Sequence, residues 1–420
     1  MWQKFLIILN DRDLRRKFLY LFGLLAIFRL AASVPILGID RELFQNYFQD
    51  NQLLGLLNIF SGGALDNLSI VMLGLSPYIT ASIIMQLFTM IFPGLKELYQ
   101  EEGEAGRQKF NQYSRLLTVP LALVQGFGLL TLLSRQGVVQ FGGFETIANL
   151  IIVTAGAVFL MWVGELITEY GIGNGASIMI FAGIIAGVPV SLQQAFVTFT
   201  PNQISTFAVF LIIALITIVA VVVISEGERP IPVYYAKRVR GMRMYGGVST
   251  HLPLRVNQAG VIPIIFAISI LLFPQMITNF FIDSANPVLR GVAGAVNAFL
   301  LNGLFYGFSY FFLVFLFTYF YTAVTFDPES IAKNLQRSGA FIPGIRPGPP
   351  TSAFLARIVT RITLVGGLFL GLIAVLPIVV RGATGITAFT LGGTALLIVV
   401  SVIIETAKQV EAQLSLRSYK

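Results

Sequence analysis

The chain contains no cysteine and a single histidine, His251. Without cysteine it can form neither disulfide bonds nor thiolate metal sites, and one histidine excludes paired-histidine zinc motifs such as H-E-x-x-H. Charged residues are also scarce, at 11% of 420 residues, whereas soluble domains carry roughly 25%. Hydrophobic residues make up 56% of the chain, and the mean hydropathy is +0.81. These values indicate a protein that crosses a membrane several times.

Long apolar runs occupy most of the sequence. A membrane-spanning helix needs about 20 mostly apolar residues, and the continuous runs found here favour helices over the alternating ten-residue segments of a β-barrel. We therefore expect an all-α polytopic membrane protein with ten transmembrane helices. The expected spans are residues 18–37, 68–92, 116–134, 148–168, 176–190, 205–224, 259–280, 303–325, 362–380 and 386–404. Residues 1–17 are expected to form an amphipathic cytoplasmic helix that leads into the first span.

Lys and Arg are distributed unevenly between the two sides of this ten-span arrangement. With the N-terminus in the cytoplasm, Arg29 falls within the first span, and only Arg41, Arg135, Arg290 and Arg381 of the 28 basic residues fall on the outer side. All the others face the cytoplasm, as the positive-inside rule requires. Both termini are therefore predicted to be cytoplasmic, and a cell inner or plasma membrane location is expected.

Two cytoplasmic loops, residues 225–258 and 326–357, are longer than a helix connection needs. "PVYYAKRVRGMRMYGG" in the first predicts a short protruding β-hairpin, and "PGIRPGPP" in the second predicts a rigid turn. One interpretation is that these basic loops only fix topology and touch anionic lipid. The other is that they bind ribosomal RNA or an acidic protein surface. The candidate docking residues are Arg238, Arg240, Arg243, Arg255, Arg346 and Arg357.

Charged residues inside the expected spans are few. Arg29, Glu165, Glu169 and Glu405 are interpreted as snorkelling or paired residues near helix ends. "GIGNGA", residues 171–176, matches a dinucleotide fingerprint, but no strand precedes it, so it predicts a tight turn. No Walker A motif and no nucleophile with a matched base is found. We therefore expect no enzymatic activity, no cofactor and no metal site.

Four glycines are spaced for close packing between helices. Gly183 and Gly187 form one G-x-x-x-G pair, and Gly367 and Gly371 form another. Such pairs let helix backbones approach each other closely in membranes.

The second span begins unusually, because "NIFSGGALDNLSI", residues 58–70, places glycines and polar residues at the front of an apolar run. A half-helix is expected to break near Ser61, Gly62 and Gly63. Irregular polar backbone at membrane depth is tolerated only when it is buried in protein or lines an aqueous cavity. Two interpretations remain at this point: a movable stopper in a central cavity, or a re-entrant loop that does not move.

Seven stretches of the sequence resemble the SecY family of protein-translocation channels. They occur in the family's order and cover essentially the whole chain: "NIFSGGAL…GLSPYITASIIMQL", "EEGEAGRQKFNQYSR", "GELITEYGIGNGASIMIFAGI", "SEGERPIPVYYAKR", "NQAGVIPIIFAISILLFP", "SGAFIPGIRPG" and "LGGTALLIVV". The resemblance implies two inverted pseudo-symmetric halves, residues 18–200 and 201–406, around a central hourglass pore, followed by a cytoplasmic tail, residues 407–420. It also implies that the stopper is a plug, formed by Leu57, Asn58, Ile59, Phe60, Ser61, Gly62, Gly63, Ala64, Leu65, Asp66 and Asn67.

The resemblance also assigns a pore ring and a lateral gate. A ring of branched apolar side chains excludes ions by dewetting and still deforms around a passing chain. The ring residues implied are Leu75, Ile79, Ile180, Ile184, Ile265 and Ile398. The gate, where the pore opens sideways to lipid, is implied to include Thr80, Gln125, Asn257 and Phe273.

The function implied is a passive protein-conducting channel that translocates unfolded secretory polypeptides and releases transmembrane segments laterally. The implied partners are SecE-like and SecG-like small membrane subunits, a SecA-like motor ATPase, the ribosome with its RNA and protein at the exit site, signal peptides and nascent chains, membrane lipids, and YidC-like and SecDF-like accessory proteins. Two other classes remain open from the sequence: a solute or ion secondary transporter with inverted repeats, and a non-conducting membrane receptor for ribosomes. Scarce charge within the spans argues against the transporter.

Overall fold

A computed structural model describes most of the chain. The described residues are 11–36, 58, 61–100, 102–135, 137, 139, 142–197, 204–235, 238–240, 243–245, 249–281, 286–384 and 392–418. Of the expected plug, Leu57, Ile59 and Phe60 lie outside these residues.

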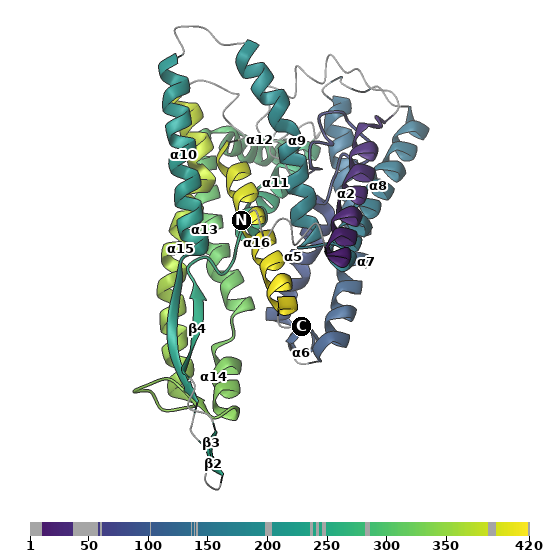
Figure 1. Ribbon diagram of the computed structural model, residues 1–420. Helices are drawn as coiled ribbons and strands as arrows, with labels where there is room; N and C mark the ends of the chain where they lie inside the picture. Colours follow the sequence, from purple (N-terminus) through teal and green to yellow (C-terminus); the bar gives the residue numbers. More distant parts are fainter. Residues whose placement is uncertain are drawn as a thin grey trace.

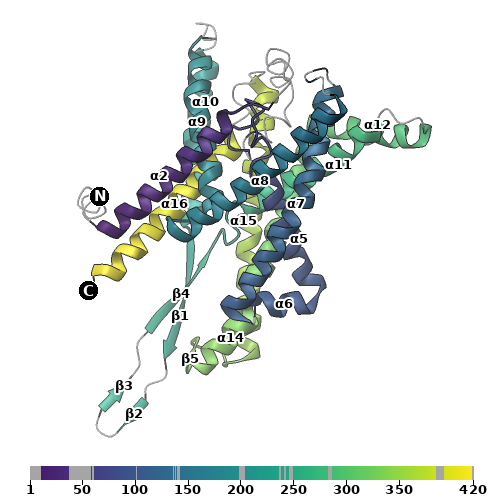
Figure 2. The ribbon, with the colours of Figure 1, turned by 90° about the vertical axis from the view of Figure 1, so that its right-hand side faces the viewer.

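Helices dominate the described structure, and a helix covers at least part of each of the ten expected spans (Figure 1). These ten are α2 (Arg12–Ser33), α5 (Ser76–Ile91), α7 (Gly103–Arg135), α8 (Gly143–Tyr170), α9 (Gly175–Val197), α10 (Ile204–Glu226), α11 (Ile262–Phe281), α13 (Gly303–Thr325), α15 (Pro349–Thr384) and α16 (Gly392–Ser418). Shorter helices are α6 (Pro93–Gln100), α12 (Pro287–Leu301) and α14 (Pro328–Arg337). Figure 2 shows α12 running sideways, away from the other helices.

Some of these helices are long and apolar enough to cross a membrane. Among the described residues these are α7, α8, α15 and the stretch Gly303–Arg337, which contains α13 and α14. The pair α5 and α6 would make a fifth, with a bend of 116° at Phe92 between the two helices. Shorter apolar helical stretches lie at Gly175–Pro189, Leu211–Glu226, Ile262–Leu271 and Pro287–Leu300.

The helix α2 begins earlier than the first expected span. The side chain of Asp11 accepts hydrogen bonds from the backbone N–H groups of Asp13 and Leu14, at 2.9 and 3.4 Å, which is the usual role of an N-cap residue. Residues 12–17 are therefore the first turns of α2, continuous with the apolar part. Residues 1–10 of the expected amphipathic helix lie outside the described residues.

A small sheet projects beyond one end of the helices, with β2 and β3 at its far tip (Figures 1 and 2). Strand β1 (Glu228–Tyr235) pairs antiparallel with β4 (Ser249–Arg255) and with β5 (Ala340–Phe341), in the order β4-β1-β5. Farther out, β2 (Arg238–Arg240) pairs with β3 (Arg243–Tyr245). The predicted hairpin is confirmed, and it is longer than "PVYYAKRVRGMRMYGG" indicated. The fold is thus mostly helical rather than all-α.

An apolar cluster joins the sheet to α14 and to the start of α15. Ile231 and Val233 alternate with exposed neighbours along β1, as a half-buried strand requires. They share a buried cluster with Leu254 of β4, Ala340 of β5 and Leu355 of α15. The sheet is therefore fixed to the helices by apolar burial.

Close packing between helices occurs at two of the four predicted glycines. A Cβ atom added to Gly367 or Gly371 would meet the rings of Phe315 and Phe311 of α13, at 3.1 and 2.7 Å. An added Cβ at Gly183 would overlap the backbone of Gly62, which belongs to a loop and not to a helix, whereas at Gly187 it would meet no described atom within 4 Å. The prediction is thus confirmed for Gly367 and Gly371, while Gly183 packs closely against a loop instead.

Candidate pore and plug

The loop between Ser61 and α5 combines buried apolar side chains with hydrogen bonds from its own polar groups. The Ser61 hydroxyl donates to the carbonyl of Asn58 at 3.0 Å and accepts from the N–H of Leu65 at 3.0 Å. The Asn58 side-chain oxygen accepts from the N–H of Asp66 at 3.2 Å, and the Ser69 hydroxyl donates to the carbonyl of Ala64 at 3.0 Å. The polar residues of this segment therefore satisfy backbone groups that would otherwise be buried without partners.

The backbone conformation of the loop and its close contact with α9 explain why the loop contains two glycines. Gly62 and Gly63 have φ angles of 67° and 80°, in the left-handed region that glycine adopts without steric cost. Gly62 also lies directly against Gly183 of α9. This contact brings two backbones together, and it needs a residue without a Cβ at Gly183.

Arg29 of α2 binds both sides of this contact. Its guanidinium donates to the carbonyl of Gly62 at 3.1 Å and to the carbonyls of Ala182 and Gly183 at 3.0 and 3.1 Å. Asp66, on the same loop, is the acidic side chain that interacts with it electrostatically. Of the two interpretations of Arg29, snorkelling or pairing, these contacts fit pairing, because the guanidinium is bound to three backbone carbonyls and interacts with Asp66.

The other charged residues within the spans fit the paired interpretation in part. Glu165 of α8 accepts from Arg115 of α7 at 2.6 Å. Glu169 forms a hydrogen bond with Tyr170. Glu405 interacts electrostatically with Tyr321 of α13, and no hydrogen bond or ion pair joins it to another residue in the described part of the chain.

All six predicted ring residues belong to one apolar cluster. Leu75, Ile180, Ile265 and Ile398 are buried in it, while Ile79 and Ile184 are half-buried against it. They come from α5 and the residue before it, α9, α11 and α16. Ala64 of the loop is buried in the same cluster. The structure thus brings helices from both parts of the sequence together around Ala64 of the predicted plug.

Leu65 does not join these residues. The plug interpretation predicts that the apolar side chain of Leu65 rests against the ring. This is wrong for Leu65, which is buried in a second cluster with Leu129, Leu130 and Leu133 of α7, because the turn after Ala64 directs the next side chain toward α7.

Two of the four predicted gate residues meet. The Gln125 amide of α7 donates to the Thr80 hydroxyl of α5 at 3.4 Å, and its oxygen accepts from the Ser76 hydroxyl at 3.3 Å. Sequence reasoning missed Ser76, although it precedes Thr80 by one helical turn and so lies on the same face of α5.

The other two gate residues lie on or next to α11. The Asn257 amide donates to the carbonyl of Gly260 at 3.1 Å, while its buried side-chain oxygen has no hydrogen-bond partner in the described structure. Its backbone lies against Gly366 of α15. Phe273 is in α11, but its side chain is outside the described part.

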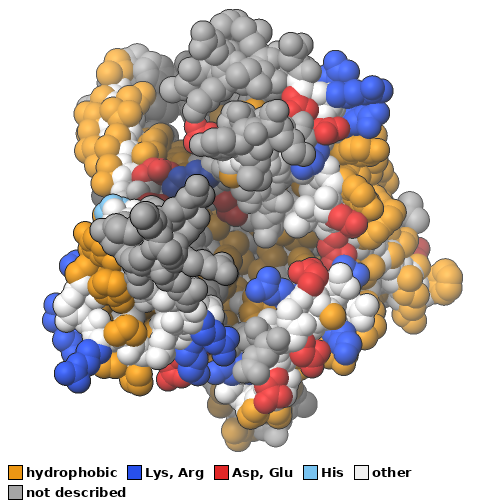
Figure 3. All heavy atoms as spheres, turned by 60° about the horizontal axis from the view of Figure 1, so that its bottom comes forward, with side chains coloured by type: hydrophobic (Ala, Val, Ile, Leu, Met, Phe, Trp, Pro, Cys, Tyr) orange, Lys and Arg blue, Asp and Glu red, His pale blue; other side chains and the backbone are white. Residues whose placement is uncertain are grey.

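The predicted docking arginines lie at the end of the molecule that carries the sheet. Arg346 and Arg357 are exposed, and Arg255 pairs with Glu228 at 3.4 Å. Arg238, Arg240 and Arg243 lie in the outermost strands. In the view that brings this end forward, Lys and Arg side chains are interspersed with Asp and Glu (Figure 3). This face is therefore mixed in charge, not uniformly basic.

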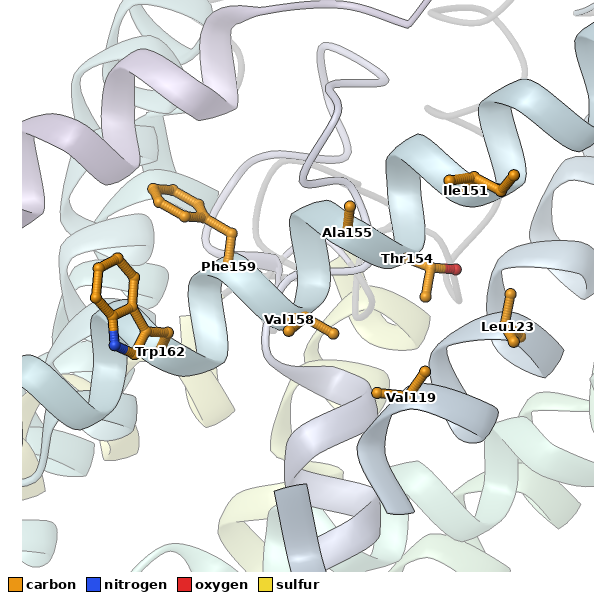
Figure 4. A pocket seen from close by; sticks show the side chains of 8 residues that line it. All are labelled: Val119, Leu123, Ile151, Thr154, Ala155, Val158, Phe159 and Trp162. Carbon is orange, nitrogen blue, oxygen red and sulfur yellow. The ribbon is translucent and has the colours of Figure 1, made fainter. Parts of the chain in front are cut away.

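A shallow apolar groove of about 560 Å³ lies between α7 and α8. Figure 4 shows its lining side chains. Thr154 is the polar residue among them, and its hydroxyl is buried without a described hydrogen-bond partner. Among the residues that the structure describes, no group of three or more His, Asp or Glu side chains is placed to hold a metal ion.

Comparisons with known proteins agree with this architecture. The SecY family model matches residues 69–407. The protein translocase subunit SecY of Mycobacterium tuberculosis is 42% identical over 446 residues, which cover 100% of this chain and 99% of the relative. A solved protein-conducting channel has a TM-score of 0.67 at 17% identity, over 95% of this chain and 92% of that chain. Sec61 in the canine ribosome-channel complex has a TM-score of 0.63 at 16% identity, over 95% and 92%. The chain belongs to the SecY family.

Proposed function

We propose that this chain is the channel subunit of a protein translocase, which passes unfolded secretory polypeptides across the membrane and releases transmembrane segments sideways into it. The observation that carries the proposal is the glycine-containing loop at residues 61–75, whose Ala64 is buried in the same apolar cluster as the six ring residues. Family membership supports it, since relatives at 42% identity are protein translocase subunits.

The proposed architecture has ten spans in two inverted halves, with both termini in the cytoplasm. A contact between the two ends of the chain supports an even number of spans. Lys17 near the start of α2 donates to Gln413 near the end of α16 at 3.2 Å, and Leu14 shares a buried cluster with Val410. The first and last helices therefore have their outer ends on the same side. The excess of Lys and Arg in the loops on that side supports a cytoplasmic position for it.

In the resting channel, the ring and the plug are proposed to seal the pore together. Branched apolar side chains exclude water and ions from a narrow passage, and the loop occupies the space beside them. A translocating chain pushes the loop aside and is gripped by the ring. Signal peptides and lipids meet at the gate between α5 and α7 on one side and α11 and α13 on the other.

The chain is proposed to depend on partners for energy and assembly. It carries no nucleotide-binding motif, so a SecA-like ATPase or a translating ribosome supplies the driving force. The projecting sheet, the turn at Arg346 and the start of α15 form the docking platform for both. SecE-like and SecG-like small subunits complete the complex, and YidC-like and SecDF-like proteins assist it.

Reconstitution tests this function directly. The chain is placed in liposomes with SecE-like and SecG-like subunits, and a signal-bearing precursor is added with a SecA-like ATPase and ATP. We expect the precursor to become protected from external protease, while the same precursor without its signal stays digestible. Binding of ribosomes without any protection would instead indicate a receptor, and solute-dependent ion flux would indicate a transporter.

A further inference from the structure

The guanidinium of Arg29 joins two separate parts of the structure. The two terminal nitrogens of its guanidinium reach different elements: Nη1 donates to the loop carbonyl of Gly62, and Nη2 donates to Ala182 and Gly183 of α9. A guanidinium is a planar fork that can hold several acceptors at fixed angles. Charged side chains are costly within a membrane and are kept there for a purpose. Here the charge bridges the plug loop and a ring-bearing helix.

We propose that Arg29 is the positioning residue that holds the plug loop shut, and that it acts as a latch between Gly62 and α9. This inference rests on the proposed role of the loop as a plug. When the loop moves away, Nη1 loses its acceptor, while Nη2 keeps both carbonyls of α9. The arginine therefore stays in place on α9, and the loop finds the same donor when it returns.

The rest of the loop is built for such a contact. Its internal hydrogen bonds run among Asn58, Ser61, Leu65 and Asp66, and from Ser69 to Ala64, so they can persist when the loop moves as a unit. Gly62 and Gly183 bring the two backbones together, which places their carbonyls within reach of one guanidinium. Asp66 adds a compensating negative charge on the moving side.

Replacement of Arg29 by Met tests the latch in the reconstituted complex. Hydrogen bonds from a charged donor are among the stronger ones in proteins, so their loss should shift the closed-to-open ratio by about tenfold or more. The measurement is the ion conductance of resting channels in planar bilayers. Arg29→Lys, which keeps the charge but not the fork, should leak to an intermediate degree. Arg290→Met, which removes a charge from the exposed face of α12, should stay ion-tight.

A structural readout separates a latch from a general loss of stability. The chain has no cysteine, so spin labels attach only at introduced positions. Labels at Asn67→Cys on the loop and Phe144→Cys on α8 report the distance between the two. In Arg29→Met we expect this distance to broaden toward longer values while the melting temperature of the complex is unchanged.

Deletion of residues 57–67 distinguishes failure of the latch from failure of the plug. In the deleted background Arg29→Met should add no further leak, because the acceptor is already gone.

If the deletion leaks but Arg29→Met and Arg29→Lys in the intact chain remain ion-tight with an unchanged label distance, the latch is wrong and the plug stands. If the deletion itself is ion-tight, the plug is wrong. Additive leaks from the two changes would also overturn the latch. Should Arg29→Met not fold, the conductance and label distance of Arg29→Lys decide in the same way.

Discussion

The loop at residues 61–75 and the projecting sheet are attached to the helices in different ways. The loop makes polar contacts as well as apolar ones: Arg29 donates to the Gly62 carbonyl, and Gly62 lies against Gly183. Ala64 and Leu65 are buried in two separate apolar clusters. The sheet is joined to α14 and α15 by a cluster of apolar side chains. Apolar burial is lost when surfaces separate, so displacing the sheet costs apolar burial, whereas displacing the loop costs its polar and glycine contacts in addition.

The largest expected effect comes from removing both parts of the proposed seal, the loop and the ring. Deletion of residues 57–67 combined with Ile79→Asn and Ile265→Asn should give the largest resting ion leak, because a hydrated ring no longer dewets. Planar-bilayer recordings measure it. The same deletion with Ile79→Val and Ile265→Val keeps the ring apolar and should leak less. An ion-tight channel after the deletion with both Asn changes would show that neither element forms the barrier.

A methyl group at Gly183 should have the next largest effect. Its Cβ would overlap the backbone of Gly62, and overpacking of this kind costs about 1–3 kcal/mol, which corresponds to a shift of about 5- to 150-fold toward the displaced loop. Gly183→Ala should therefore raise the resting conductance. Gly187→Ala, one turn further along α9 where the added group meets nothing, is the matched control. Equal conductance in both variants would mean that the glycine contact does not hold the loop.

A change beneath the sheet should lower translocation without causing a resting ion leak. Leu355 is fully buried beneath it, and Leu→Ala at such sites typically costs about 2–5 kcal/mol. We expect Leu355→Ala to lower motor-driven translocation while the resting channel stays ion-tight. Phe341→Ala, at a side chain that is 40% exposed, should change either property little. A leak in Leu355→Ala would show that the two regions are not independent.

Charge reversal at Arg346 tests docking without disturbing the sheet. The Thr351 hydroxyl donates to the backbone carbonyl of Arg346 at 2.8 Å, so the side chain is not needed to hold the turn. Arg346→Glu should reduce precursor translocation by the SecA-like motor and leave the melting temperature unchanged. Lys333→Glu on α14 makes the same charge change away from the turn, and it should reduce translocation less. Normal translocation by Arg346→Glu would remove this residue from the docking surface.

The helices and the hairpin were predictable because each depends on local sequence. Apolar runs indicated the helices, and the alternating residues of "PVYYAKRVRGMRMYGG" indicated the hairpin that contains β2 and β3, whereas β4 lies beyond that stretch. The contacts of Arg29 were not predictable, since its acceptors lie 33 residues away in the loop and more than 150 residues away in α9. A backbone carbonyl also leaves no signature in the sequence. The side of the loop that Leu65 faces depends on a turn whose direction only the fold determines.

The smallest expected effect belongs to the gate. Gln125→Leu removes the hydrogen bonds to Thr80 and Ser76, and polar contacts between membrane helices contribute about 1 kcal/mol each. The α5–α7 side should loosen slightly, which changes the signal hydrophobicity needed for translocation. Asn257→Leu should act independently, because the described hydrogen bond of Asn257 goes to Gly260 and not to Gln125. The shifts of the two single variants, measured with a series of signals of graded hydrophobicity, should therefore add in the double variant. A double variant that differs from their sum would show that the two residues are coupled across the gate. If neither single variant changes the signal hydrophobicity needed for translocation, both residues have a structural role only.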